Sequence, residues 1–245
     1  MMIPFFFSNT VKSMKKKENI QKMFNDISGR YDFLNHFLSL GIDYSWRRKF
    51  VKQLSPYRPQ QVLDVASGTG DLAQLICSLS PQQVIGVDIA ENMLAIAKQK
   101  CLQNNLQKML RFEEGDAEQL SFPDNHFDAV TVAFGVRNFE NLETGLIEML
   151  RVLKPGGVMM VLEFSHPTKF PWKQLYSFYS KYIIPLVGKI VSRNNQAYTY
   201  LPESVSVFPS GQDFLDILQK RGLRNTMQRP LTFGVATIYA GEKLS

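Results

Sequence analysis

Short apolar runs alternate with segments of helical periodicity over most of the chain. Continuous apolar runs, which predict buried strands, occupy residues 62–65, 84–88, 110–114, 127–133, 158–164 and 235–240. Segments with apolar residues at helical spacing, which predict helices, occupy residues 71–79, 91–104, 142–153 and 213–219. Because apolar strands that alternate with helices are typical of a parallel sheet covered on both faces, the pattern predicts a doubly wound α/β fold.

The segment that precedes this alternation has a different pattern. Apolar residues recur at helical spacing over residues 18–37 and 44–54, with a break near Gly41, which predicts short helices. We therefore expect a helical extension or cap at residues 1–55 and one larger domain at residues 56–245.

The composition excludes several classes of protein. The chain of 245 residues is 44% hydrophobic and 20% charged, which is normal for a folded domain and excludes a disordered chain. No run of 18 apolar residues lacks a charge, so no membrane-spanning helix is expected. The two cysteines, Cys77 and Cys101, cannot build a disulfide framework and fit a reducing cytoplasm. The three histidines lack the spacing of metal ligands, so no metal site is expected.

The positive charge is concentrated near the N-terminus. Residues 1–60 carry eleven Lys and Arg residues against four Asp and Glu residues, so they hold the whole excess behind the net charge of +6. Basic clusters lie at residues 15–17 and 47–49. A basic end on a neutral body favours an anionic surface as partner, either lipid headgroups or nucleic acid. The alternative is a solvated face that only adds solubility.

A glycine-rich turn follows the first predicted strand. Residues 64–71 read DVASGTGD, and such a turn lets the backbone approach a ligand while the next helix offers unpaired N–H groups. Asp88 closes the second strand, where a carboxylate can accept both hydroxyls of a ribose; alternatively, it caps the helix that starts at Glu91. Enzymes that bind NAD and enzymes that bind S-adenosylmethionine both use this arrangement, so the turn alone leaves the cofactor open.

Two further motifs lie after the third strand and before the fifth. Residues 115–117, Gly-Asp-Ala, bring a carboxylate to a position where it can face an adenine amino group. Residues 151–157 read RVLKPGG, and we expect residues 154–157 to end the preceding helix as a C-cap turn.

Together these motifs resemble those of the class I S-adenosylmethionine-dependent methyltransferases. The chain is most similar to the ubiquinone/menaquinone biosynthesis C-methyltransferases, the UbiE family, over nearly its whole length beyond the first thirteen residues. The family signatures are YDFLNHFLSLGIDYSW at residues 31–46, FGVRN at residues 134–138, and RVLKPGG continuing to LEFS at residues 151–165. Three positions depart from the family pattern: Asp43 in place of the usual histidine, Ala66 in place of the first glycine, and Ala133 in place of a serine.

The resemblance implies a Rossmann-like fold with a mostly parallel seven-stranded sheet, helices on both faces and an N-terminal helical extension. It also implies S-adenosylmethionine as the methyl donor and no metal ion. Asp88 is expected at the ribose, Thr69 near the methionine end, and Asp116 with Ala117 at the adenine. The full set of expected cofactor-binding residues is Ala66, Gly68, Thr69, Gly70, Asp88, Asp116 and Ala117.

For the reaction, the resemblance implies C-methylation of a polyprenylated quinol, with demethylmenaquinol to menaquinol as the first choice. Loss of a proton from a ring hydroxyl raises the electron density at the neighbouring carbon, so the site needs a base and a donor for the oxyanion. Arg137 and Asn138, after the fourth strand, are expected to bind the oxygen. The candidates for the base are Tyr31, Asp32, His36 and Asp43.

An aromatic-rich insert at about residues 164–208 is the other expected part of the substrate site. Leu175, Phe178, Tyr179 and Tyr182 recur at helical spacing, which predicts a helix packed on the core as a lid. Its aromatic side chains are also expected to line a channel for the polyprenyl tail.

Several alternatives remain open at this point. The methyl acceptor is alternatively the benzoquinol of ubiquinone biosynthesis. On the glycine turn and Asp88 alone, the chain is alternatively an NAD-dependent oxidoreductase or a regulatory module that binds S-adenosylmethionine without catalysis. We expect a cytoplasmic protein in peripheral contact with the anionic inner face of the cell membrane, without a nucleic-acid partner, and we leave a homodimer open.

Overall fold

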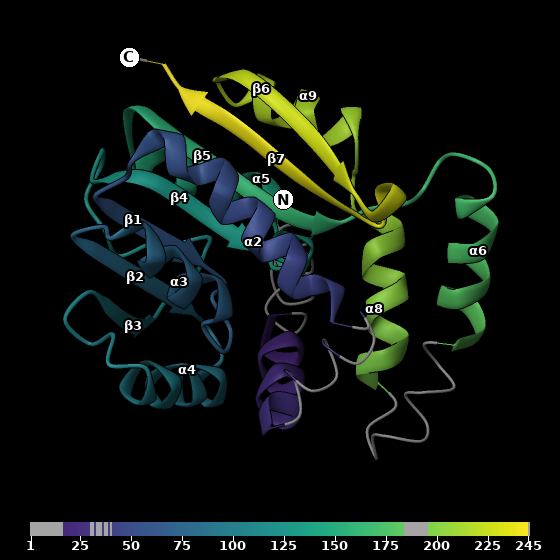
Figure 1. Cartoon of the computed structure of the whole chain (residues 1–245), viewed down its shortest axis with the longest axis horizontal. Helices are drawn as coiled ribbons and strands as arrows, with labels where there is room; N and C mark the ends of the chain where they lie inside the picture. The colour runs from purple at the N-terminus through teal and green to yellow at the C-terminus, as the bar shows by residue number, and fades with distance from the viewer. Residues whose placement is uncertain are drawn as a thin grey trace, which may run out of the picture.

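Seven strands form one sheet in the order β3-β2-β1-β4-β5-β7-β6 (Figure 1). This is seen in a computed structural model, which describes residues 17–29, 32, 36, 39, 41–183 and 196–244. The strands are β1 (Gln61–Val65), β2 (Gln83–Asp88), β3 (Leu110–Glu114), β4 (Phe127–Ala133), β5 (Leu153–Phe164), β6 (Leu223–Leu231) and β7 (Ala236–Lys243).

The sheet is mostly parallel, as predicted. Strand β1 pairs in parallel with β2 and β4, β2 pairs in parallel with β3, and β4 pairs in parallel with β5. Only β7 is reversed, and it lies antiparallel to both β5 and β6. The reversal follows from the short connection η5 (Thr232–Gly234) between β6 and β7, since parallel neighbours need a long crossover.

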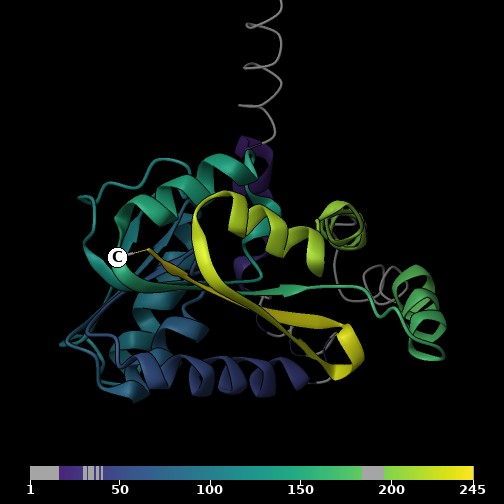
Figure 2. The ribbon, with the colours of Figure 1, turned by 90° about the horizontal axis from the view of Figure 1, so that it is seen from above.

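Helices cover both faces of the sheet (Figure 2). One face carries α2 (Ile42–Leu54), α3 (Asp71–Ile76) and α4 (Glu91–Gln103), whose apolar side chains share one core cluster with the strands. The other face carries α5 (Leu142–Val152) and α9 (Gln212–Lys220), whose apolar side chains belong to a second cluster. The predicted α/β class is therefore confirmed.

Beyond the carboxyl end of β5, the described residues form three helical segments. They are α6 (Trp172–Phe178), the π-helical turn η4 (Tyr179–Ile183) and α8 (Gln196–Val207). Figure 1 shows α6 and α8 side by side at the edge of the molecule, away from α3 and α4. The helix predicted around Leu175 and Tyr179 is thus present. Within the described ranges, no helix has the length and apolar character needed to cross a bilayer.

The connection before β5 differs from the prediction. Helix α5 ends at Val152, and residues 154–157 belong to β5 instead of forming a C-cap turn. The register between β4 and β5 shifts in this region, which is a bulge, and Gly156 adopts a φ of 74° that favours glycine. Lys154 Nζ binds Asp128 Oδ1 at 2.6 Å, which holds the bulge against β4.

Strand β6 was not predicted from the sequence. It is an edge strand whose pattern of burial is irregular, with most of its side chains partly or fully exposed. Pro230 lies within it, and proline is tolerated at an edge because its missing N–H costs no ladder hydrogen bond there. The strand is recognised only through its pairing with β7.

Candidate functional site

Two hollows lie at the carboxyl edge of the sheet, and Phe134 lines both of them. The smaller, which we call the loop cleft, is formed by the turns after β1, β2, β3 and β4 together with the helical residues 17–29. The larger, which we call the aromatic cavity, lies between α2, the end of β5, α6, α8 and η5. Doubly wound sheets bind ligands at this edge, beside the point where the strand order reverses.

The glycine turn after β1 forms one wall of the loop cleft. Gly68 has a φ of 56° with open space beside its Cα, so the backbone is accessible to a ligand. Gly70 has a φ of 81°, and an added Cβ there would lie 2.6 Å from the ring of Phe112. Ala66 adopts a φ of 51°, which a glycine would adopt without strain. The turn therefore needs small residues for its shape and for close approach of a ligand.

A buried carboxylate, Asp64, and a half-buried one, Asp88, hold the turn in place. Asp64 accepts hydrogen bonds from Ser67 Oγ and Thr131 Oγ1, both at 2.8 Å, and burial raises its pKa to about 6. Asp88 accepts from the backbone N–H of Gly68 at 2.8 Å and of Ala90 at 2.9 Å. Burial raises the pKa of Asp88 as well, against the effect of these bonds. Asp88 thus supports the start of α4 and lines the cleft at the same time.

The helical residues 17–29 close the loop cleft from outside. Lys17 forms an ion pair with Asp116, and Gln21 Nε2 donates to the carbonyl of Ile89 at 2.5 Å. Side chains of Ile20 and Phe24 line the cleft. The remaining free space is about 80 Å³, well below that of an open ligand site of about 300 Å³ or more. The helix has to shift for a nucleoside to enter.

Side chains of different chemistry line the cleft. Asp88 supplies a carboxylate, and apolar Ile89 and Met93 lie beside it. Asp116 and Ala117, which follow β3, also line it. The expected residues that line the cleft are Ala66, Gly68, Asp88, Asp116 and Ala117. The remaining two, Thr69 and Gly70, lie in the same turn but outside the cleft lining.

Thr69 connects the turn to the N-terminal segment. Its Oγ1 donates to Asp32 Oδ1 at 2.5 Å. Asp32 also pairs with Lys100 Nζ at 2.6 Å, and Lys100 pairs with Asp71 at 2.7 Å. Asp32, a predicted base, is therefore engaged by two donors beside the glycine turn. Tyr31, the other base in the same motif, lies outside the described residues.

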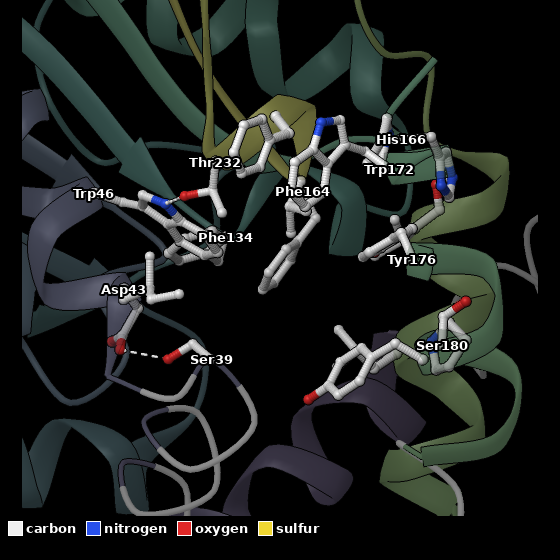
Figure 3. Close-up of a pocket in the computed structure, with 18 of the residues that line it drawn as sticks. Ser39, Asp43, Trp46, Phe134, Phe164, His166, Trp172, Tyr176, Ser180 and Thr232 are labelled. Carbon is white, nitrogen blue, oxygen red and sulfur yellow. Dashed lines mark hydrogen bonds between the residues drawn. The ribbon is translucent and has the colours of Figure 1, made fainter. Parts of the chain in front are cut away.

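The aromatic cavity has a volume of about 730 Å³ and mostly apolar walls. In Figure 3, Asp43 and Ser39 lie on one side of it, across from Tyr176 and Ser180. Burial raises the pKa of Tyr176 to about 12, so its hydroxyl remains protonated at neutral pH. The aromatic residues of its lining are Trp46, Phe134, Phe164, His166, Trp172, Tyr176, Tyr179 and Phe233. Its size and walls suit a flat apolar ligand.

A polar cluster forms the α2 side of the cavity. Asp43 accepts from Ser39 Oγ at 2.6 Å, lies 2.7 Å from His36 Nδ1 and forms a hydrogen-bonded ion pair with Arg47. Burial of Asp43 alone would raise its pKa, but the bonds from Ser39 and Arg47 outweigh it and hold the pKa below its usual value. Asp43 is therefore a carboxylate at neutral pH and a weak proton acceptor.

Arg137 and Asn138 lie where the two hollows meet. Arg137 lines the aromatic cavity, and Asn138 lines the loop cleft. Arg137 Nη1 donates to Glu163 Oε1 at 2.7 Å, and Tyr200 Oη donates to Asn138 Oδ1 at 2.9 Å. Glu163 is fully buried, which raises its pKa, while the Arg137 charge acts in the opposite direction.

Sequence reasoning missed the partners that hold these residues. The pairing of Asp43 with Arg47 has the i, i+4 spacing of helical ion pairs, which is a signal the sequence contains. Glu163 and Tyr200 meet Arg137 and Asn138 only through the tertiary fold, and no local spacing indicates them. Among the residues that the structure describes, no group of three or more metal-ligating side chains is arranged to hold a metal ion.

Comparison with known proteins places the chain among methyltransferases. A family model described as "ubiE/COQ5 methyltransferase family" matches residues 11–243. A protein of Bacteroides fragilis named demethylmenaquinone methyltransferase is 49% identical over 94% of this chain and 94% of its own length. A Geobacter sulfurreducens protein named ubiquinone/menaquinone biosynthesis C-methyltransferase is 46% identical over 94% of this chain and 90% of its own. A solved SAM-dependent methyltransferase of Thermotoga maritima shares the fold, with a TM-score of 0.63, 20% identity and coverage of 91% and 98%.

Proposed function

The chain belongs to the ubiE/COQ5 methyltransferase family, and from this we propose that it methylates a ring carbon of demethylmenaquinol with S-adenosylmethionine as the donor. The observation that carries the proposal is the pair of hollows that meet at Phe134, one suited to a nucleoside and the other to a flat aromatic ring. The name and the 49% identity of the Bacteroides fragilis relative favour the naphthoquinol. The double name of the Geobacter sulfurreducens relative keeps the benzoquinol of ubiquinone biosynthesis as the second candidate.

We propose that the loop cleft holds the cofactor. S-adenosylmethionine, when bound, supplies a methyl group on a sulfonium, which is already a good leaving group. Asp88 would accept the ribose hydroxyls, and Asp116 with Ala117 would meet the adenine. The turn of Ala66, Gly68, Thr69 and Gly70 would approach the cofactor with its backbone, because it contains small residues and has open space beside Gly68.

We propose that Arg137 and Asn138 bind the quinol oxygen next to the reacting carbon. The Arg137 guanidinium, on a side chain that is 6% exposed, would stabilise the negative charge that develops on this oxygen when its proton leaves. Asn138 Oδ1 would accept a hydrogen bond from the Tyr200 hydroxyl. The amide N–H of Asn138 would then donate to the quinol oxygen. Asp32 and Tyr31 remain our candidates for the group that takes the proton, and the sharing of Asp32 with Thr69 and Lys100 gives it a defined position.

We also propose that the enzyme collects its quinol at a membrane surface. A polyprenyl tail partitions into lipid, and the aromatic cavity would admit the ring with the start of the tail between α6 and α8. The basic residues among the first sixty would attract an anionic bilayer, in keeping with a cytoplasmic protein that visits the inner face of the cell membrane.

The direct test is methyl transfer from labelled S-adenosylmethionine to short-chain quinols held reduced by dithionite. We expect a 2-prenyl-1,4-naphthohydroquinone to gain one ring methyl group, identified by mass spectrometry, and to react faster than the matching benzoquinol. The same incubation with NADH in place of S-adenosylmethionine should leave both quinols unmethylated. Faster methylation of the benzoquinol would favour the second candidate, and no transfer to either ring would contradict the proposed function.

A further inference from the structure

We propose that Arg47 binds the second oxygen of the quinol, the one remote from the reacting carbon, and so makes the aromatic cavity selective for 1,4-diols. This inference rests on the proposed function, in which Arg137 serves the oxygen beside the reacting carbon. It assigns a substrate-binding role to a residue of α2 that the sequence motifs did not indicate.

The first support is the hydrogen bonding of Arg47. The residue lines the aromatic cavity and is only 8% exposed. Its Nη1 donates to Asp43, and its Nη2 lies 3.8 Å from Asp71 Oδ2. Its Nε has no hydrogen-bond partner among the described residues. A buried N–H without a partner is destabilising, so a ligand that supplies an oxygen there gains a bond at little cost.

The second support is the matching arrangement around Arg137. This residue is paired with a buried carboxylate, Glu163, and its Nε is also without a partner in the described part of the chain. Both arginines therefore line the cavity, and each has a buried donor left over. A ligand with two acceptor oxygens would satisfy both donors, whereas a ligand with one oxygen would leave one of them unmet.

The third support is the aromatic wall between the two arginines. The Arg47 guanidinium carbon lies 5.5 Å from the ring centre of Phe134, and the Arg137 guanidinium carbon lies 5.3 Å from that of Phe164. The two phenylalanine rings are 4.6 Å apart. Each of the two neighbouring rings thus has one guanidinium beside it, and we infer that a 1,4-quinol packed against them directs one oxygen to each.

The charge of Arg47 is already balanced by Asp43, and this affects what it can bind. An arginine whose charge is balanced by a carboxylate can donate a hydrogen bond to a neutral oxygen. The remote oxygen of the quinol keeps its proton during the reaction, so a neutral hydroxyl oxygen suits this position. The oxygen beside the reacting carbon becomes anionic, and there the Arg137 side chain, which is 6% exposed and paired with Glu163, supplies the charge.

The test combines two enzymes with two substrates. The first substrate is 2-prenyl-1,4-naphthohydroquinone, and the second is 3-prenyl-1-naphthol, which keeps only the hydroxyl beside the reacting carbon. We expect the wild-type enzyme to prefer the diol in kcat/KM by about tenfold or more, the scale of a hydrogen bond to a charged group. Arg47→Gln should lose this factor on the diol and change little on the naphthol. Arg47→Lys keeps a cation beside Asp43 but lacks the Nε donor, and should lose the preference too.

Ligand binding can be measured directly, so that a variant with little turnover still tests the assignment. Trp46 lines the same cavity, so quenching of its fluorescence reports the binding of 1,4-naphthoquinone and of naphthol without any reaction. Arg47→Gln should weaken quinone binding and leave naphthol binding unchanged. The exposed neighbour supplies the control variant, Arg48→Gln, which should behave as wild type in both measurements. Affinity for S-adenosylmethionine should be close to wild type in all three variants. Arg47→Gln leaves the buried Asp43 without its cation and should lower the melting temperature, whereas Arg47→Lys keeps the cation and should melt close to wild type.

Three results would overturn the assignment. Equal losses on diol and naphthol would mean that Arg47 only fixes α2 to α3 through Asp43 and Asp71. A large loss of affinity for S-adenosylmethionine would mean that Arg47 meets the carboxylate of the cofactor instead. A wild-type enzyme that does not prefer the diol would contradict it directly. Failure of the proposed function looks different, because wild type would then methylate neither ring and bind neither in the cavity.

Discussion

At the scale of single residues, the site depends on acidic side chains that are buried with their donors. Asp64, Asp88 and Glu163 close strands β1, β2 and β5 or lie near their ends, and burial raises the pKa of each one. Asp43 differs, because the bonds from Ser39 and Arg47 lower its pKa. The same residue type therefore supplies structural supports, the proposed ribose acceptor and a counter-ion, according to its partners.

Asp88→Ala should weaken binding of S-adenosylmethionine. Loss of the two acceptor oxygens at the ribose should cost roughly 1.5–3 kcal/mol, the range of hydrogen bonds to a charged group. Isothermal titration calorimetry measures the change, and Glu91→Ala, at an exposed position in the first turn of α4, is the matched control. An unchanged dissociation constant in a folded Asp88→Ala protein would remove Asp88 from the cofactor site.

Arg137 should affect turnover more than cofactor binding. Its partner in the proposed reaction is the charge on the quinol oxygen, so Arg137→Lys should still lose much of the rate because the planar fork is gone. Arg137→Ala also leaves Glu163 buried without its cation, so its melting temperature has to be compared with that of Arg137→Lys. If Arg137→Ala turned over a soluble quinol near the wild-type rate, Arg137 would have no role at the oxygen.

Asp64 should make the stability of the fold depend on pH. Its pKa is about 6 in the folded state and near 3.8 when unfolded, so the folded state binds the extra proton between these values. Its contribution to the free energy of unfolding is full below pH 4 and declines as the pH rises through 6, by about 2–3 kcal/mol in total. Asp64→Asn has no carboxyl group that titrates at this position. The free energy of unfolding of the variant, relative to that of wild type, should therefore rise between pH 4 and pH 6.

Chemical denaturation at pH 4, 5, 6, 7 and 8 would measure this difference. The exposed Asp26→Asn on the N-terminal helix is the control and should track wild type at each pH. A difference between Asp64→Asn and wild type that stays constant with pH would mean that Asp64 titrates like an exposed carboxylate.

At the scale of elements, the sequence predicted what depends on local pattern. The inner strands are continuous apolar runs and the covering helices have one apolar face, so their positions agree with the structure closely. Strand β6 was not predicted, because its exposed side chains and Pro230 give no alternation of apolar and polar residues. Only its pairing with β7 defines it. The turn at residues 154–157 was misjudged because Pro and Gly suit a bulge as well as a helix end.

The same limit applies to the candidate site. Most of the residues proposed to bind the cofactor line one cleft, because they lie in turns that follow neighbouring strands, and the motifs mark these turns. The ion pairs of Arg47 with Asp71 and of Arg137 with Glu163 join different elements, so no spacing along the chain specifies them. The aromatic insert indicated an apolar cavity, but the residues that α2 and η5 contribute follow from the tertiary fold.

The N-terminal helix should oppose cofactor entry through its ion pair. If Asp116 is to meet the adenine amino group, Lys17 has to leave it first. Lys17→Met should therefore bind S-adenosylmethionine up to about fivefold more tightly, since a partly exposed ion pair contributes at most about 1 kcal/mol. Added salt screens the ion pair, so the affinity of wild type should approach that of the variant.

Lys22→Met is the control, because Lys22 is an exposed residue on the same helix. It should leave the dissociation constant as in wild type at low and at high salt. Weaker binding by Lys17→Met would contradict this account and would mean that Lys17 contacts the cofactor itself.

At the scale of the whole molecule, apolar side chains gather around the aromatic cavity on the outside. Phe170 and Phe178 are 80% and 59% exposed, and they flank and end the helix α6 that lines the cavity. Phe233 on η5 is 62% exposed and stacks on Trp172 at 3.6 Å. Exposed Lys169 lies next to Phe170 in the chain. Apolar rings beside a basic residue at the mouth of a cavity are suited to the headgroup region of a bilayer.

We therefore expect the region around α6 to dock on lipid, with the basic N-terminal residues adding attraction. The double variant Phe170→Ser, Phe178→Ser should lower the partition onto anionic vesicles by about a hundredfold or more, because each ring loses apolar contact worth about 1.5 kcal/mol or more. Liposome flotation measures it. Leu102→Ser is the matched control, since Leu102 is also 59% exposed but lies on α4, away from α6 (Figure 1).

A chain shortened to begin after Lys17 separates the two contributions to membrane binding. The shortened chain should lose the salt-sensitive part of the binding, because the electrostatic attraction falls off within about 10 Å at 0.1 M salt. The double phenylalanine variant should instead retain the salt dependence and lose binding to neutral vesicles. Wild-type flotation that is equal on neutral and anionic vesicles at every salt concentration would contradict the electrostatic part. Unchanged flotation of the double variant would show that α6 does not enter the bilayer and that the quinol reaches the cavity by another route.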